Sequence, residues 1–282
     1  IVSGFNNVVD VVATGGYNTT DGDTGNIFVL RSNGTVWTAG NGQFGQLGNG
    51  TLVSTSTFVQ ATGLTNIVRI YAAPTHWGAY AFAVNSSGQV FAVGANAVGN
   101  LGTGNTTQYS TYQPISGGFT GKVAKIVLAS NAMISSSYAF SYILDTDGNV
   151  WATGYNVGQL GTGATPNLST FTKMQKSTNG AKALDIRAMG YGAGSGFAAV
   201  ITQDDGTMMG IGQNNFGQTG TDVNSNSSVY NLKYVLGFGP GQNASQFSGG
   251  LVPFNLLTGA QLGNVVDNLN FTQQVNWSTA SN

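Results

Sequence analysis

One pattern occurs four times along the sequence, and this internal repeat limits the possible folds more than any other feature. The first copy reads Phe28-Val-Leu-Arg-Ser-Asn-Gly34-Thr-Val-Trp37-Thr-Ala-Gly40, and a glycine-rich segment follows it. The first glycine of each copy stands at position 34, 88, 148 or 206, so the copies lie 54, 60 and 58 residues apart. A period of this length is typical of propeller blades rather than of helical solenoids.

Each copy predicts a β-hairpin with another strand before it. Residues 28–30 and 35–38 are short β-branched and aromatic runs, and the Ser-Asn-Gly between them suits a tight turn with positive φ. Before the hairpins lie four short segments of alternating apolar residues, each with a polar residue at its centre: 8–12, 67–71, 123–127 and 183–187. Such alternation is typical of half-buried strands. We expect the later Gln-Leu-Gly turn to pack its leucine between neighbouring blades.

A tryptophan motif within the repeat resembles a known family. Trp-x-x-Gly followed by Gly-Gln-Leu-Gly-x-Gly occurs from Trp151 to Gly163 and from Trp37 to Gly50. This string resembles the repeat of the regulator of chromosome condensation family, over about residues 7 to 222. The resemblance implies an all-β fold, a propeller-like array of about four (or five) antiparallel blades with long glycine-rich loops.

The resemblance says less about function than about fold. The family includes nucleotide-exchange factors, secreted β-lactamase inhibitors, lectin-like binders and viral surface proteins, so the fold does not give the activity. We expect a viral or bacterial surface member. The family typically closes seven blades, so a ring of that size would need sequence from upstream or from another chain.

The repeats divide the chain into two parts. Residues 1–222 are expected to hold the propeller repeats, and 223–282 a different C-terminal part. The expected blades lie near 7–51, 66–106, 122–165 and 183–222. Residues 223–250 are rich in Asn, Ser and Gly, which predicts a long loop or linker.

The C-terminal part contains an echo of the N-terminus. Gly263-Asn-Val-Val-Asp267 resembles Asn7-Val-Val-Asp10. Either a fifth blade begins there, or these strands complete the blade that opens at the other terminus, which would remove an exposed sheet edge. If neither happens, an open edge favours pairing between chains.

Composition excludes several classes of protein. The charged residues number 19, which is 7% of the chain against roughly 25% in ordinary soluble domains. The net charge of −1 leaves no basic stripe, so nucleic acid is not an expected partner. Cysteine is absent, which excludes disulfides, thiolate zinc sites and cysteine nucleophiles. No apolar run reaches the length of a membrane span, so no membrane insertion is expected. The chain begins without methionine, and we expect a removed leader or an upstream domain.

The candidate catalytic groups have simpler interpretations. His76 is the only histidine, and neither a Gly-x-Ser-x-Gly elbow nor a second imidazole accompanies it. The pairs Asp145/Asp147 and Asp204/Asp205 resemble the two carboxylates of a glycosidase, but aspartate before glycine is favoured by turn geometry. Possible calcium loops, such as the one beginning at Asp145, lack the terminal glutamate of an EF-hand. We therefore predict no enzyme, no catalytic residue, no metal and no cofactor.

The segments before the hairpins carry aromatic residues among small polar ones, and we interpret them as loops on one face of the propeller. Aromatic rings beside Asn, Ser and Thr suit a sugar or a protein partner. The alternative is that these rings only pack at the blade ends. The candidate ligand-binding residues are Tyr17, His76, Trp77, Tyr138 and Tyr191.

Low charge, no cysteine, no glutamate and abundant Gly, Asn, Ser and Thr are typical of exported fibre and appendage proteins. Our first hypothesis is a non-enzymatic extracellular propeller on a virion or cell surface, structural or receptor-binding. Its partners would be itself, other virion or surface proteins, or a host-surface glycan or receptor. The alternative is a secreted lectin-like or protein-inhibitor propeller that acts alone. A carbohydrate-active enzyme would need two facing aspartates in a cleft.

Overall fold

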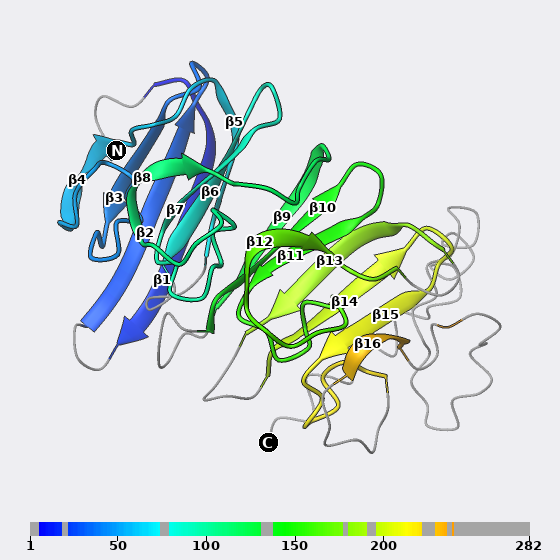
Figure 1. The fold of residues 1–282 in the computed structure, drawn as a ribbon. Helices are drawn as coiled ribbons and strands as arrows, with labels where there is room; N and C mark the ends of the chain where they lie inside the picture. The colour runs from blue at the N-terminus through cyan, green and yellow to red at the C-terminus, as the bar shows by residue number, and fades with distance from the viewer. Residues whose placement is uncertain are drawn as a thin grey trace, which may run out of the picture.

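The computed structural model describes residues 6–18, 22–73, 79–130, 138–176, 180–190, 196–221, 229–235 and 239 of the 282-residue chain. Within these residues the chain forms sixteen strands in four antiparallel sheets of four strands each (Figure 1). The sheets follow one another in chain order, from the blue first sheet to the yellow fourth. The structure confirms the expected all-β, propeller-like array of blades.

Each sheet is a meander of four consecutive strands, which we call a blade. The first blade contains β1 (Val8–Asn18), β2 (Gly22–Arg31), β3 (Val36–Gly40) and β4 (Thr55–Gln60). The second blade contains β5 (Ile67–Ala72), β6 (Tyr80–Asn85), β7 (Val90–Gly94) and β8 (Tyr109–Pro114). The third blade contains β9 (Val123–Ala129), β10 (Phe140–Asp145), β11 (Val150–Gly154) and β12 (Leu168–Lys173). The fourth blade contains β13 (Ala183–Met189), β14 (Ala198–Gln203), β15 (Met208–Gly212) and β16 (Val229–Tyr234).

The hairpin between the second and third strands is built in the same way in every blade. Its turn contains a glycine with φ of 78°, 85°, 78° or 81° at positions 34, 88, 148 and 206. Side chains with a Cβ rarely adopt this left-handed conformation, which explains why the repeat keeps glycine there.

The blades are arranged with their first strands together. The extensive contacts between blades join β1 to β5, β5 to β9 and β9 to β13, and the second strands β2 and β10 also reach the first strand of the next blade. The first strands therefore line the inner side of the row, as the innermost strands of a propeller line its axis.

Each blade buries one face of its sheet against the next. We call the face towards the following blade the forward face and the opposite one the back face. Three apolar clusters fill the spaces between consecutive blades. Leu101 packs with Phe171 of the third blade, and Leu160 packs with Ile186 and Phe197 of the fourth. Both leucines are fully buried, which confirms that the Gln-Leu-Gly type of turn packs its leucine between blades.

The structure corrects three expectations about the chain's organisation. Each blade has a fourth strand after the glycine-rich segment, so the blades extend beyond the predicted boundaries at 51, 106, 165 and 222. Strand β16 lies within residues 223–250, which were expected to be only a loop or linker. The segment around Tyr17 was expected to be a loop, but β1 continues to Asn18 and pairs with β2 up to Gly22. The predicted fifth unit near 263–267 lies outside the described residues.

No helix in the described part of the chain has the length and apolar character of a membrane span.

Candidate functional site on the axial strands and loop ends

The central polar residues of the first strands occupy equivalent positions on the inner side of the blades. They are Asp10 in β1, Arg69 in β5, Lys125 in β9 and Asp185 in β13. In every blade the pairing register between the first and second strands shifts just before this residue. A β-bulge bends a strand and changes the direction of its side chains, which explains how a polar residue is accommodated in an otherwise apolar strand.

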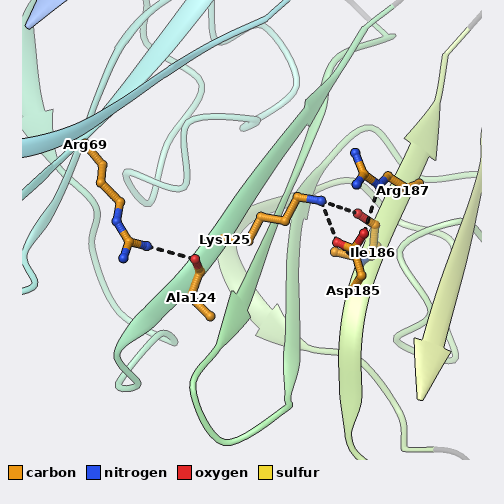
Figure 2. A network of polar contacts seen from close by, with 6 residues as sticks. All are labelled: Arg69, Ala124, Lys125, Asp185, Ile186 and Arg187. Carbon is orange, nitrogen blue, oxygen red and sulfur yellow. Dashed lines mark hydrogen bonds and ion pairs between the residues drawn. The ribbon is translucent and has the colours of Figure 1, made fainter. Parts of the chain in front are cut away.

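Three of these residues, Arg69, Lys125 and Asp185, link consecutive blades (Figure 2). Arg69 donates from Nη1 to the carbonyl oxygen of Ala124, in the third blade, at 2.8 Å. Lys125 donates from Nζ to Asp185 Oδ1 at 2.5 Å and to the Ile186 carbonyl at 3.3 Å, both in the fourth blade. The second, third and fourth blades are therefore joined in series along their inner strands.

Asp185 is the most strongly engaged carboxylate of this set. Its Oδ2 accepts from Arg187 Nε at 2.9 Å, while its Oδ1 contacts Lys125. Burial raises the pKa of Asp185, but the hydrogen bond and charge of Lys125, the Ile186 backbone N–H and Arg187 together lower it below its ordinary value. The group is therefore a fixed anion at neutral pH.

Asp145 and Asp205 accept hydrogen bonds within their own hairpin turns, in agreement with the interpretation from the sequence. Asp145 Oδ1 accepts from the backbone N–H of Asp147 at 3.0 Å and of Asn149 at 2.8 Å. Its Oδ2 accepts from the indole N–H of Trp151 at 2.9 Å. In the fourth blade, Asp205 Oδ1 accepts from the backbone N–H of Thr207 at 3.0 Å.

Asp204 accepts a backbone hydrogen bond from outside its own turn. Its Oδ1 accepts from the backbone N–H of Lys182 at 2.9 Å. Among the described residues, no group of three His, Cys, Asp or Glu side chains is arranged to hold a metal ion.

Tyr138 is the one predicted ligand-binding residue whose side chain is described. It lies two residues before the third blade's second strand and stacks on Phe197 of the fourth blade, with ring centroids 5.7 Å apart and planes 9° apart. Tyr155 meets the Tyr138 ring edge-on at 4.9 Å. The ring is half-buried against the cluster between the third and fourth blades, so packing at a blade end accounts for Tyr138.

The other four predicted site residues are not brought together by the described structure. Tyr17 lies in β1 opposite Asp23, and only its backbone is described. His76, Trp77 and Tyr191 lie outside the described residues. Their role in ligand binding therefore stays a prediction.

Sequence reasoning noticed the polar centre of each first strand but assigned it no role. The signal was a charged residue that interrupts an alternating apolar strand, in a chain with only 19 charges. What the sequence could not give was the neighbour across the blade boundary, because Lys125 and Asp185 are sixty positions apart.

Comparisons with known proteins agree with this geometry. The model of the regulator of chromosome condensation (RCC1) repeat matches residues 33–79. The fold is similar to a chain in the crystal structure of Kap60 bound to yeast RCC1 (Prp20), with a TM-score of 0.62 and 16% identity, covering 83% of this chain and 50% of that chain. Prp20p from Saccharomyces cerevisiae gives a TM-score of 0.61 at 16% identity, covering 83% and 51%.

A human structure gives a similar result. WBSCR16 matches with a TM-score of 0.58 and 20% identity, covering 84% of this chain and 54% of that chain. The chain thus spans about half the length of the structures it matches. With the repeat match and the four blades, these similarities show that the chain has an RCC1-like repeat β-propeller fold.

Proposed function

We propose that this chain is a non-enzymatic binding propeller that serves as a structural or receptor-binding subunit at the surface of a virus, phage or bacterial cell. Its ligand would be a protein or a host-surface glycan, bound at the loop end of the blades. The low charge and the absence of cysteine and glutamate support an exported role of this kind.

The observation that carries the proposal is the series of links between blades. Arg69 donates a hydrogen bond to the third blade, and Lys125 donates one to the fourth. Deeper in the second interface, the Tyr80 hydroxyl donates to the Phe140 carbonyl at 2.7 Å. Residues on loops act as binding groups when a rigid scaffold positions them, and these cross-blade bonds supply such a scaffold.

The engagement of the carboxylates supports a non-enzymatic role. A glycosidase needs two carboxyl groups that face each other across a bound sugar. Asp145 accepts hydrogen bonds within its own turn, and Asp185 is held by two cations. A carboxylate whose oxygens are committed to structural donors is a poor general acid or base, because proton transfer needs access to the substrate.

The similar structures favour a protein partner. They include yeast RCC1 bound to Kap60, and Prp20p, whose structure is described together with its binding to Gsp1p and histones. The identity is 16% in both cases, so we transfer only the general mode, a propeller that presents a surface to other macromolecules.

The test is a binding measurement with a variant at the loop end. Purified chain is applied to a glycan array and to cells that display candidate receptors, and saturable binding is measured for wild type and for a Trp77→Ala/Tyr191→Ala variant. We expect the double variant to lose binding by at least about 10-fold, as aromatic anchors of interfaces do.

A matched control tests the opposite end of the blades. Ser86 and Thr146 are exposed in hairpin turns at that end, so a Ser86→Ala/Thr146→Ala variant should bind like wild type. Equal binding by the wild type and the loop-end variant would contradict the proposed site, and turnover of a bound glycan would contradict the non-enzymatic role.

A further inference from the structure

The glycine-rich loop of one blade docks on the next blade at a fixed place. In the first blade, the loop glycine Gly45 lies so close to the second blade that an added Cβ would stand 2.6 Å from the Tyr109 carbonyl oxygen and 2.7 Å from the Ser110 Cα. A few residues later, Gly50 donates its N–H to the Ser110 carbonyl at 2.8 Å.

The second blade repeats this contact with equivalent residues. A Cβ at Gly99 would stand 2.6 Å from both the Leu168 carbonyl oxygen and the Ser169 Cα of the third blade. Gly104 donates its N–H to the Ser169 carbonyl at 2.8 Å. The loop therefore inserts against the start of the next blade's fourth strand, with the same arrangement of the two backbones at both boundaries.

The third blade's loop also reaches the next blade. A Cβ on Gly212, at the end of β15, would stand 2.9 Å from the Gln159 Cβ. A Cβ on Gly161 would stand 2.9 Å from the Ile211 Cδ1. The chain thus uses a loop contact at each of its three blade boundaries.

The fourth blade has the same loop, residues 214–220, which we call the plug. Its internal hydrogen bonds match those of the first blade: Gly217 N–H donates to the Asn214 carbonyl and Gly220 N–H to the Gly217 carbonyl, at 3.1 and 2.9 Å. The φ angles of Gly45 and Gly217 are 76° and 74°. The plug is therefore already in the docking conformation.

Among the described residues, nothing covers the outer side of the plug. Phe216 is 83% exposed, whereas Val98, at the equivalent position of the second blade, is 7% exposed. A Cβ added to Gly217 would meet no described atom within 4 Å. The contact that the next blade makes with the second blade's loop is therefore missing, among the described residues, at the equivalent loop of the fourth blade.

The first blade carries a matching receiving surface, which we call the socket. It is a hollow of about 480 Å³, and its wall includes Ile27, Ala39, Gly40, Thr55 and Ser56. Thr55 pairs with Gly40 as Tyr109 pairs with Gly94 and Leu168 with Gly154, so Thr55 and Ser56 are the docking residues of the first blade.

The back face around the socket is apolar and open. Ile27 is 43% exposed, whereas the equivalent Ala81 and Ala199 are fully buried by the preceding blade. Val11 is 54% exposed, and Ile126, at the equivalent position of the third blade, is 4% exposed. The first blade thus lacks, among the described residues, the contact that every later blade receives.

We propose that the plug of one copy of this chain docks into the socket of a second copy. The occupant follows from the three contacts within the chain, because plug and socket are the two halves of that same interface. The inference rests on the proposed function as a surface assembly and names its partner as the chain itself.

This contact joins two different surfaces, so it is heterologous, and its geometry decides between a closed ring and an open array. The described part of one copy holds four blades, so two copies in head-to-tail contact would bring eight blades together. We expect a dimer of twice 29.0 kDa.

Sedimentation velocity on residues 1–282 tests the proposal, from about 1 to about 300 µM, where interfaces of modest size dissociate. We expect concentration-dependent association of the wild type. Phe216→Ser and Gly217→Ala should each weaken it by at least about 10-fold, the first by removing the apolar anchor and the second by placing a Cβ on the partner's backbone.

Gly206→Ala is the matched control for Gly217→Ala. Gly206 has φ of 81°, and a Cβ added there would meet no described atom within 4 Å, so the backbone strain is alike, but the residue lies in the hairpin turn away from the plug. This variant should associate like wild type. Thermal unfolding of each variant checks that the fold is retained.

Mixing separates this contact from others. Ile27→Asp disables the socket and leaves the plug intact, and Phe216→Ser does the opposite. Neither variant should associate alone. Their equimolar mixture should form a dimer, because the plug of the first variant can dock into the socket of the second. A wild type that stays monomeric at the highest concentration overturns the inference, as does association that Phe216→Ser leaves unchanged. If the chain stays monomeric but still binds its ligand through Trp77 and Tyr191, the docking inference fails and the proposed function stands. If the chain assembles but binds no ligand, the docking inference stands and the proposed ligand binding fails.

Discussion

The third and fourth blades have the same strands and hairpins, but their forward faces differ in size and polarity. At equivalent positions, the third blade carries Tyr142, Leu144, Val150 and Leu160, all buried against the fourth blade. The fourth blade has smaller or more flexible residues at those places: Val200, Thr202, Met208 and Thr219. The repeat therefore specifies the backbone in both blades, while the forward-face side chains are larger in the third blade, which a described blade of the same chain covers.

The smaller forward-face residues of the fourth blade also affect the proposed contact between two copies of the chain. Thr219 is buried but bonds Thr221 at 2.8 Å, where the other blades place a leucine in the next blade's core. A contact through the plug then depends on Phe216 and the loop backbone rather than on a large apolar core. Such an interface is weaker than an in-chain blade boundary, which suits an assembly that forms from folded chains.

The leucine position should give the largest contrast between the two blades. Leu160→Ala leaves a cavity between the third and fourth blades and should lower the free energy of unfolding by about 3 to 4 kcal/mol. Thr219→Ala, at the equivalent position, removes one hydroxyl bond and should cost about 1 kcal/mol. Urea denaturation of both variants measures the difference. Equal losses would mean that the two forward faces are packed alike.

The loop glycines give the second contrast. Both Gly99 and Gly217 have positive φ, so alanine strains each backbone by about 1 kcal/mol. At Gly99 the new Cβ also meets backbone atoms of the third blade, which should raise the total loss to about 2 to 3 kcal/mol. Denaturation of dilute protein isolates the intrachain effect. Identical losses for Gly99→Ala and Gly217→Ala would show that the second blade's loop is not docked.

The first residue of the hairpin turn is charged in the third blade and neutral in the fourth. Asp145 holds the third blade's turn, whereas the equivalent residue of the fourth blade is Gln203. Asp145→Ala leaves the Trp151 indole and turn N–H groups without their acceptor, and we expect a loss of about 2 kcal/mol. Asp145→Asn should cost less, because Asn85 accepts the same turn N–H bonds in the second blade.

The Asp145 contribution should depend on pH. Burial raises the pKa of Asp145, but the hydrogen bonds from Trp151, Asn149 and Asp147 outweigh burial and lower it below its ordinary value. A lowered pKa means that the carboxylate stabilises the fold above its unfolded pKa of about 4 and that this stability is lost as the pH falls through the folded pKa. The gap between wild type and Asp145→Asn should therefore narrow in acid, as measured by urea denaturation at several pH values. A constant gap from neutral pH to about pH 2 would contradict this assignment.

The ion pair between Lys125 and Asp185 should have the smallest effect. Both side chains are about one-third exposed, so we expect Asp185→Asn to cost about 1 kcal/mol or less. A double-mutant cycle with Lys125→Met isolates the link between the third and fourth blades. Additive effects of the two substitutions would show that the pair does not couple the blades. Because the pKa of Asp185 is lowered, any coupling should also disappear in acid.

Much of the fold could be predicted from the sequence, because short motifs within each repeat determine the hairpins and the blade boundaries. The turn glycines at 34, 88, 148 and 206 set the hairpins, and the leucines at 101 and 160 marked the blade boundaries. The fourth strands were missed for a physical reason. They lie at the outer edge, and β8 and β12 bury only one aromatic ring each, Tyr112 and Phe171, so their apolar periodicity is weak.

The candidate site was harder to predict. The sequence indicated Tyr138 as a ligand-binding residue because of its place in the repeat. In the structure its ring stacks on Phe197 of another blade, so it packs between blades. The exposure of the plug could not be predicted from the sequence either. Phe44 and Phe216 stand in nearly the same sequence context, but Phe44 is half-buried beside the second blade, whereas Phe216 is 83% exposed because no described blade follows the fourth.

Disulfide trapping tests the central claim, that one loop-to-blade contact is used both within and between chains, most directly. The chain has no cysteine, so Gly217→Cys and Ser56→Cys introduce single thiols on plug and socket. Within the chain, the equivalent positions are Gly99 and Ser169. A Cβ added to Gly99 would stand 2.9 Å from the Ser169 Cβ, close enough for a disulfide after a small adjustment. We predict that mild oxidation of the mixed variants forms a heterodimer of one copy of each, and that replacing Ser56→Cys with the exposed control Ser86→Cys does not. Equal cross-linking by Ser56→Cys and Ser86→Cys, or none by either, would contradict the account.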